Sequence, residues 1–157
     1  MPSLAHDEQR AATDWFTDEL TAAATCSTGQ VAMVERSARE GHMPPLLRRC
    51  EAETYRVLEG EVAFFVGNDM VWARPGDVVV APRDVPRTFR VTSPEARWLV
   101  FTQVRSLDRF TDFGRAVSPP LACPGEGWPS PEERAAVAAI GAANDIELLG
   151  PPGALPA

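Results

Sequence analysis

The 157-residue sequence has no lysine, two histidines and three cysteines, and it has no long apolar run. All 15 basic residues are arginine, and the net charge is −7. The chain therefore lacks the basic patch expected of a nucleic-acid-binding protein. None of its apolar runs approaches the roughly 18 residues needed to cross a membrane.

The cysteines at positions 26, 50 and 123 are far apart and form no C-x-x-C pair. This spacing supports neither a disulfide framework nor a zinc knuckle. Because we also find no signal peptide, the simplest expectation is a reducing cytoplasm.

Prolines and glycines are abundant, at 15 and 11, and they separate short runs rich in valine, phenylalanine, tryptophan and threonine. Short strands bounded by turn residues are typical of a β-sandwich or β-barrel. The expected strands cover residues 30–37, 53–60, 61–69, 70–77, 78–86, 87–93 and 96–104. The sequence thus predicts an all-β fold.

The two ends of the chain have a different pattern. Residues 1–14 are polar and mixed, which predicts a loose N-terminal tail before a barrel over residues 15–105. Residues 106–117 have a helical period. Ser130, Pro131 and Glu133 form a helix start ahead of residues 131–144. Residues 106–157 are therefore expected to form C-terminal helices and a surface tail.

Charged residues interrupt the apolar pattern around residue 53. If the strand is regular, Leu47, Arg49, Glu53, Tyr55 and Val57 share one face. Tyr55 and Val57 are typical core residues, so the two charged side chains are expected to point toward the core. Charges in such a place are costly unless they are paired.

The spacing of these residues resembles the two motifs of the cupin superfamily. The first motif, G-x5-H-x-H-x3,4-E-x6-G, is matched by Gly41, Leu47, Arg49, Glu53 and Gly60. The second, G-x5-P-x-G-x2-H-x3-N, falls on a second set of five positions: Gly76, Pro82, Asp84, Arg87 and Val91. The resemblance covers residues 15–105 and implies a single small jelly-roll-like β-barrel. The chain is similar to bacterial quercetinase-like single-domain cupins. The resemblance also implies a homodimer.

The chain departs from the family at the metal ligands. Three histidines and one glutamate hold the ion in metal-binding cupins, whereas here the histidine positions hold Leu47, Arg49 and Arg87, and only Glu53 remains. Leucine has no donor atom, and arginine stays protonated. We therefore expect no metal and no other cofactor. A replacement set of Glu53, His42 and one cysteine would need an irregular strand.

Two interpretations of Arg49, Glu53 and Arg87 remain open. They either close the old metal site as a plug, or they leave one arginine available to bind a small anionic ligand. Glu53 and Tyr55 are the candidate catalytic residues, although neighbouring arginines should lower the pKa of Glu53 and weaken it as a base. The remaining candidate ligand-binding residues are mostly apolar or aromatic: Leu47, Phe89, Trp98, Phe101 and Gln103.

Three functions are compatible with these residues. The first is a metal-independent cupin that binds or transforms a small anionic or aromatic molecule, for example as an isomerase, cyclase or lyase. The second is a metal-dependent, quercetinase-like dioxygenase with unconventional ligands. The third is a structural or regulatory dimer with a closed barrel. The sequence leaves open whether the protein is catalytic.

Overall fold

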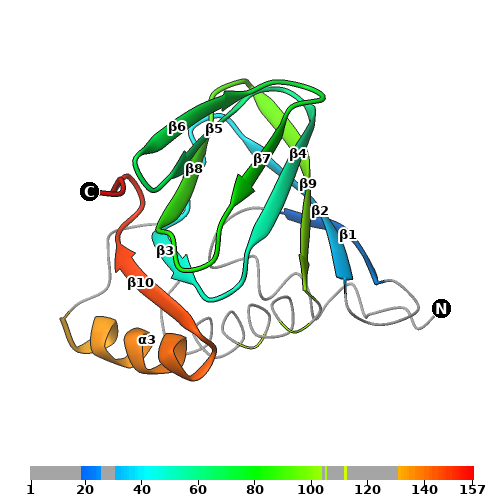
Figure 1. Cartoon of the computed structure of the whole chain (residues 1–157). Coiled ribbons are helices and arrows are strands. Elements are labelled where there is room, and N and C mark those ends of the chain that lie inside the picture. Colours follow the sequence, from blue (N-terminus) through cyan, green and yellow to red (C-terminus); the bar gives the residue numbers. More distant parts are fainter. Residues whose placement is uncertain (1–18, 26–30, 104, 106–111, 113–130) are drawn as a thin grey trace.

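The structure is a computed structural model, and it describes residues 19–25, 31–103, 105, 112 and 131–157. Its strands form two five-stranded sheets that face each other (Figure 1). The first sheet runs in the order β1 (Glu19–Thr25), β2 (Val31–Arg39), β9 (Glu95–Gln103), β4 (Glu53–Glu59) and β7 (Val78–Ala81). The second runs in the order β10 (Ile146–Gly150), β3 (Leu46–Arg49), β8 (Arg87–Val91), β5 (Val62–Val66) and β6 (Asp69–Ala73).

All strand pairs in the two sheets are antiparallel. The predicted all-β, jelly-roll-like fold is confirmed, with short strands separated by turns as the composition indicated. In the part of the chain that is described, the two sheets face each other and do not join into one continuous sheet.

The core lies between the two sheets and follows the alternation of the strands. Every second residue of β9 is buried, including Ala96, Trp98 and Val100, while the residues between them are more exposed. The facing sheet contributes Val62 and Phe64 from β5. This period of two is what a sheet with one buried face requires. It fixes which side chains can reach the interior.

Gly60 is required where β4 turns into β5. Its φ angle is +75°, a left-handed conformation that glycine adopts at no steric cost. A Cβ atom at this position would lie 2.1 Å from the Glu95 carbonyl oxygen and 2.5 Å from Ser93 Oγ. The last glycine of the first motif therefore allows a turn to pack closely against the start of β9.

The segment that the sequence analysis treated as one strand is in fact two. β3 ends at Arg49, and β4 begins at Glu53 in the opposite sheet. Residues 50–52 make the corner between the sheets. The inward face is nevertheless the predicted one on both sides of the corner, because Leu47, Arg49, Glu53 and Tyr55 are all buried.

The C-terminal segment differs from the expected surface tail. Helix α3 (Pro131–Ala143) agrees with the predicted helix, but Ile146–Gly150 then forms β10, which pairs with β3. Figure 1 shows α3 and β10 together at one end of the sheets. Ile146 is buried, which explains why the strand is held in the sheet. Apart from residue 112, the predicted helix over residues 106–117 and the N-terminal tail lie outside the described residues.

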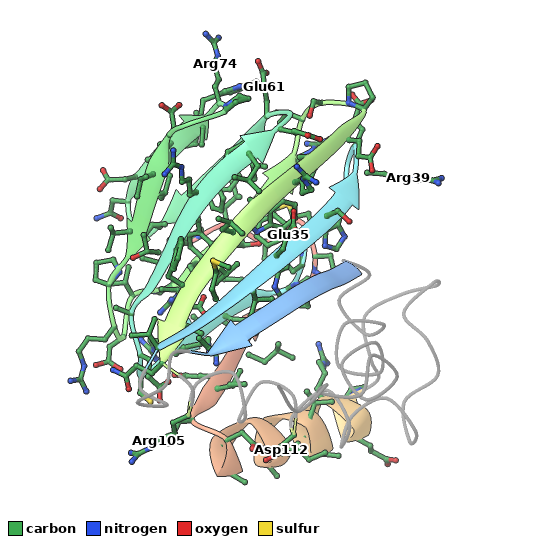
Figure 2. The ribbon with its side chains drawn as sticks, turned by 90° about the vertical axis from the view of Figure 1, so that its right-hand side faces the viewer. Glu35, Arg39, Glu61, Arg74, Arg105 and Asp112 are labelled. Atoms are coloured by element: carbon green, nitrogen blue, oxygen red, sulfur yellow. The ribbon has the colours of Figure 1, made fainter. Side chains whose placement is uncertain are left out.

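In the described part of the chain, no helix is long and apolar enough to cross a membrane. Figure 2 looks onto the outer face of the first sheet, where Glu35 of β2 lies near the middle. The Glu35 carboxylate faces Arg97 of β9, with 3.1 Å between Oε1 and Nε. This outer face therefore carries charged pairs, in contrast to the interior described next.

Candidate functional site

The candidate site lies between the two sheets and is centred on Glu53 at the start of β4. One carboxylate oxygen, Oε1, accepts a hydrogen bond from Arg49 Nη1 at 2.5 Å. The other, Oε2, accepts one from the Tyr55 hydroxyl at 2.6 Å and one from Arg87 Nη1 at 3.4 Å. Glu53, Arg49 and Arg87 are only 7%, 6% and 5% exposed. The buried charge is therefore paired on both oxygens, as burial of a carboxylate requires.

Arg87 also connects the loops around the site. Its Nη2 donates to the backbone carbonyl of Glu51 at 2.9 Å and to that of Pro82 at 3.2 Å. The Asp84 backbone N–H donates to the Arg49 carbonyl at 2.8 Å. These bonds link the β3–β4 corner to the β7–β8 turn. The charged cluster thus fixes two loops of the barrel as well as one carboxylate.

The pKa values of the two candidate catalytic groups move in opposite directions. Burial alone raises the pKa of Glu53, but the charges of Arg49 and Arg87 and the hydrogen bond from Tyr55 outweigh it and hold that pKa below the ordinary value. Burial, reinforced by the Glu53 charge, raises the pKa of Tyr55 well above its ordinary value. Glu53 therefore stays a carboxylate, and Tyr55 stays a neutral hydrogen-bond donor.

Neither group is suited to general acid–base chemistry near neutral pH. A general base works best when its pKa lies near the working pH, whereas the pKa of Glu53 is shifted away from it. The Tyr55 hydroxyl already donates its hydrogen bond to Glu53. Glu53 instead provides a fixed negative charge, and Tyr55 provides a fixed hydrogen-bond donor. Fixed charges and donors of this kind can stabilise a bound group electrostatically.

A pocket with a volume of about 70 Å³ opens beside this cluster. That volume lies below the ~300–1,000 Å³ that is usual for small-molecule sites. The walls come from both sheets and are mostly apolar. They consist of Arg36, Pro44, Pro45, Leu47, Arg49, Glu53, Tyr55, Phe64, Val66, Arg87, Thr88, Phe89, Trp98 and Val100.

Arg36 is the charged pocket residue that the sequence analysis missed. It lies on β2 between the buried residues Val34 and Ala38 of the same face, and it is partly buried. The alternation of residues 32, 34, 36 and 38 was the signal that could have identified it. Its charge also contributes to the low pKa of Glu53. The pocket therefore has three arginines rather than two.

Aromatic rings form a continuous group along the pocket. Tyr55 stacks on Phe64 with 4.8 Å between ring centroids, and Phe64 lies 6.0 Å from Phe89. Phe89 then meets Trp98 edge to face at 5.0 Å and His42 at 5.6 Å. These are favourable ring geometries. They give the wall next to the charged cluster a defined aromatic surface.

Of the candidate residues, seven line the pocket together: Leu47, Arg49, Glu53, Tyr55, Arg87, Phe89 and Trp98. Phe101 and Gln103 do not. Both lie on the face of β9 opposite to Trp98, where Phe101 is partly exposed beside Met33 and Thr54, and Gln103 is exposed. Naming both Trp98 and Phe101 as ligand-binding residues ignored the alternation of β9, so Phe101 and Gln103 are corrected to the outer face.

The side chains at the family's metal-ligand positions do not fit a metal ion. Leu47 offers no donor atom, and the guanidinium groups of Arg49 and Arg87 present N–H donors toward Glu53. The His42 ring packs against Phe89. Over the described ranges, no three histidine, cysteine, aspartate or glutamate side chains come together in a group that could hold a metal.

The fold and the motif spacing define a cupin, and comparison with known families agrees. Residues 34–102 match the family described as Cupin domain, a range that contains both motifs. Residues 34–102 therefore form a cupin domain. A comparison with curated proteins gave no match.

Solved structures with a similar fold include several cupins. The Cnp3 cupin domain of Schizosaccharomyces pombe aligns with a TM-score of 0.50 and 13% identity, over 59% of this chain and 68% of that one. An RmlC-like cupin from Shewanella frigidimarina has a TM-score of 0.45 and 15% identity, over 48% and 67% of the two chains.

The DMSP lyase DddQ from Ruegeria pomeroyi aligns with a TM-score of 0.45 and 25% identity. The alignment covers 48% of this chain but only 39% of DddQ. What these structures share with this chain is the cupin fold.

Proposed function

We propose that this cupin binds a small organic anion in its barrel pocket without a metal ion. The observation that carries the proposal is the charge of the pocket wall. Three guanidinium groups, those of Arg36, Arg49 and Arg87, face one carboxylate, Glu53, among the described lining residues. Guanidinium groups bind carboxylate and phosphate groups through planar pairs of N–H donors, so a wall with three of them suits an anionic ligand.

The three arginines have different roles in this proposal. Arg49 and Arg87 are hydrogen-bonded to Glu53 and to loop carbonyls, so they form a fixed base for the pocket. Arg36 comes from a different strand, is less buried and lines the same space. It is the arginine best placed to contact the anion, with the other two supplying the surrounding positive potential.

Any reaction in this pocket would depend on electrostatic stabilisation. In an isomerase, cyclase or lyase reaction that forms an enolate or carboxylate, the arginines would stabilise the developing negative charge. The low pKa of Glu53 argues against a reaction that begins with a difficult proton abstraction by that residue. The quercetinase-like alternative gains no support from the side chains at the ligand positions.

A closed barrel in a structural or regulatory homodimer is the second candidate. It is favoured by the complete pairing of Glu53, whose two oxygens are both occupied by neighbours within the chain. The two candidates differ in one measurable respect. The pocket proposal requires anion binding that depends on Arg36, and the closed barrel does not.

Calorimetric titration with small carboxylates and with their neutral amides tests the proposal. We expect the carboxylates to bind and the amides not to bind. Replacing Arg36 with methionine should weaken carboxylate binding about tenfold or more, since a hydrogen-bonded charge contributes ~1.5–3 kcal/mol. Arg56→Met is the matched control, because Arg56 is exposed on the outward face of β4.

Equal binding by Arg36→Met and by the wild type would refute the proposed site, and no carboxylate binding at all would favour the closed barrel. Elemental analysis of the purified protein completes the test. Stoichiometric iron, manganese, nickel, copper or zinc would contradict metal independence.

A further inference from the structure

The outer face of the first sheet carries a mostly apolar row that crosses four strands. The strand register aligns Val80 of β7, Thr54 of β4, Phe101 of β9 and Met33 of β2. All four point away from the core, because the residues before and after each of them are buried. The outer face of an antiparallel sheet is commonly solvated and polar. A mostly apolar row at this place is therefore unusual for a face in contact with water.

The apolar side chains of this face remain accessible in the single chain. Val80 and Val78 of β7 are each 57% exposed, and Val31 at the start of β2 is 49% exposed. Phe101 and Met33 are partly exposed between them. Single exposed apolar residues are ordinary, but a contiguous set on one face is typical of an interaction surface.

A second row of the same face carries opposite charges on the two sides of Leu99. Arg56 of β4 and Glu35 of β2 are both paired with Leu99 of β9. Arg56 is exposed and forms no ion pair with another described residue. Glu35 faces Arg97 at 3.1 Å, and Arg97 also faces Glu59 at 3.0 Å. These two arginines and two glutamates carry no net charge, so two copies of this group would not repel each other.

The positions of Arg56 and Glu35 distinguish the ways in which two such faces could meet. Neighbouring strands lie ~4.8 Å apart, so the two residues flank β9 at about equal distances. A twofold axis along β9 would place β4 of one copy over β2 of the other. Arg56 of each copy would then face Glu35 of the other, and Leu99 would face its own counterpart. An axis across the strands would place β4 over β4 and would leave Arg56 without an opposite charge.

The size of the face suits a stable dimer. Five strands that lie ~4.8 Å apart, with the longest of them nine residues at ~3.4 Å per residue, measure about 24 Å by 30 Å at the widest. This area is comparable to the ~800 Å² that each partner buries in a standard interface. Figure 2 shows β1, β2, β9 and β4 side by side on this face.

We propose that two copies of this chain associate through the outer face of the first sheet, with the twofold axis along β9. The apolar row forms the centre of the interface, and each Arg56 faces Glu35 of the other copy. Glu35 keeps its contact with Arg97, because a carboxylate can accept several hydrogen bonds. The pocket lies on the inner side of this sheet, so the proposal is independent of what the pocket binds.

Sedimentation velocity of the full chain over a range of concentrations tests the proposed face. We expect the wild type to be a dimer at micromolar concentration. Phe101→Glu should weaken the dimer about tenfold or more, because it sets two like charges against each other at the axis. Arg90→Glu is the matched control and should leave the dimer unchanged, since Arg90 is exposed on the outer face of the second sheet.

Two charge reversals test the direction of the axis. Arg56→Glu and Glu35→Arg should each weaken self-association about tenfold or more, because either homodimer would contain two pairs of like charges. A mixture of the two variants should form a heterodimer, because each positive side chain again faces a carboxylate. Circular dichroism verifies that the variants are folded. If Glu35→Arg does not fold, the wild type, Phe101→Glu and Arg56→Glu still test the face.

Each result supports or overturns a stated part of the proposal. A wild type that stays monomeric overturns it, and the apolar row would then bind a different partner. A dimer that Phe101→Glu leaves intact forms through another face. If Phe101→Glu weakens the dimer but the mixed charge variants form no heterodimer, the axis does not run along β9. None of these measurements involves carboxylate binding, so this proposal and the proposed function can fail separately.

Discussion

Arg48 and Arg49 are consecutive residues of β3, and the alternation of the strand gives them opposite surroundings. Arg49 points into the barrel, is 6% exposed and pairs with Glu53. Arg48 points outward and pairs with Glu147 of β10, with 2.6 Å between Nη2 and Oε2 and 40% of its side chain exposed. Both ion pairs have short contacts, so distance does not distinguish them.

Solvent is what distinguishes the two pairs. An exposed pair is screened by water and salt and contributes ~0–1 kcal/mol. In a buried network, removal of one partner leaves a charge without compensation and costs ~3–5 kcal/mol. Arginine should therefore contribute much to stability at the inward-facing position 49 and little at the outward-facing position 48.

Glu53→Gln should give the largest effect, because it leaves Arg49 and Arg87 facing a neutral amide. We expect the free energy of unfolding to fall by ~3–5 kcal/mol, measured by urea denaturation at neutral pH. Glu147→Gln is the matched control on the outer pair and should cost less than ~1 kcal/mol. Equal losses of unfolding free energy in the two variants would show that burial does not make the inner pair contribute more to stability than the outer pair.

The pH dependence of stability sharpens the same contrast. The pKa of folded Glu53 lies below its ordinary value of 4.5, so on acidification the unfolded chain takes up the proton first. The stability that Glu53 contributes is therefore complete above that ordinary value and is lost as the pH falls below it, toward the folded pKa. The difference between wild type and Glu53→Gln should be constant from pH 6 to pH 8 and shrink in acid.

Urea denaturation of both proteins across this range measures the difference. Subtracting the Glu53→Gln curve removes the contribution of the other carboxylates. A stability difference that stayed constant down to pH 3 would contradict the lowered pKa of Glu53 in the folded protein. The difference between wild type and Glu147→Gln should remain small throughout.

The contrast also shows which parts of the molecule could be predicted from the sequence. The resemblance to the cupin motifs identified Leu47, Arg49, Glu53 and Arg87 as neighbours, because that family places the residues at these positions around one metal ion. The strand period was a sound guide wherever it was applied, as it was at Tyr55. Phe101 was misplaced because it was chosen for its aromatic character and not for its position on β9.

Two other features needed the three-dimensional structure. Arg36 follows the alternation of β2, but only the pairing of β2 with β9 shows that it lies beside Trp98. The strand Ile146–Gly150 is short and ends next to prolines, so its local pattern is that of a tail. Its pairing with β3 depends on contacts between residues about 100 positions apart, which no local signal encodes.

The smallest effect is expected for the outer pair, and a double-mutant cycle on Arg48 and Glu147 measures it. Arg48→Gln, Glu147→Gln and the double variant should give a coupling free energy of ~0.2–1 kcal/mol in urea denaturation, reduced by added salt. Arg48 and Glu147 are direct partners in the pairing of β10 with β3. Because β3 also carries Arg49, a larger, salt-insensitive coupling would mean that the C-terminal strand positions the inner cluster, and the two arginines would not act independently.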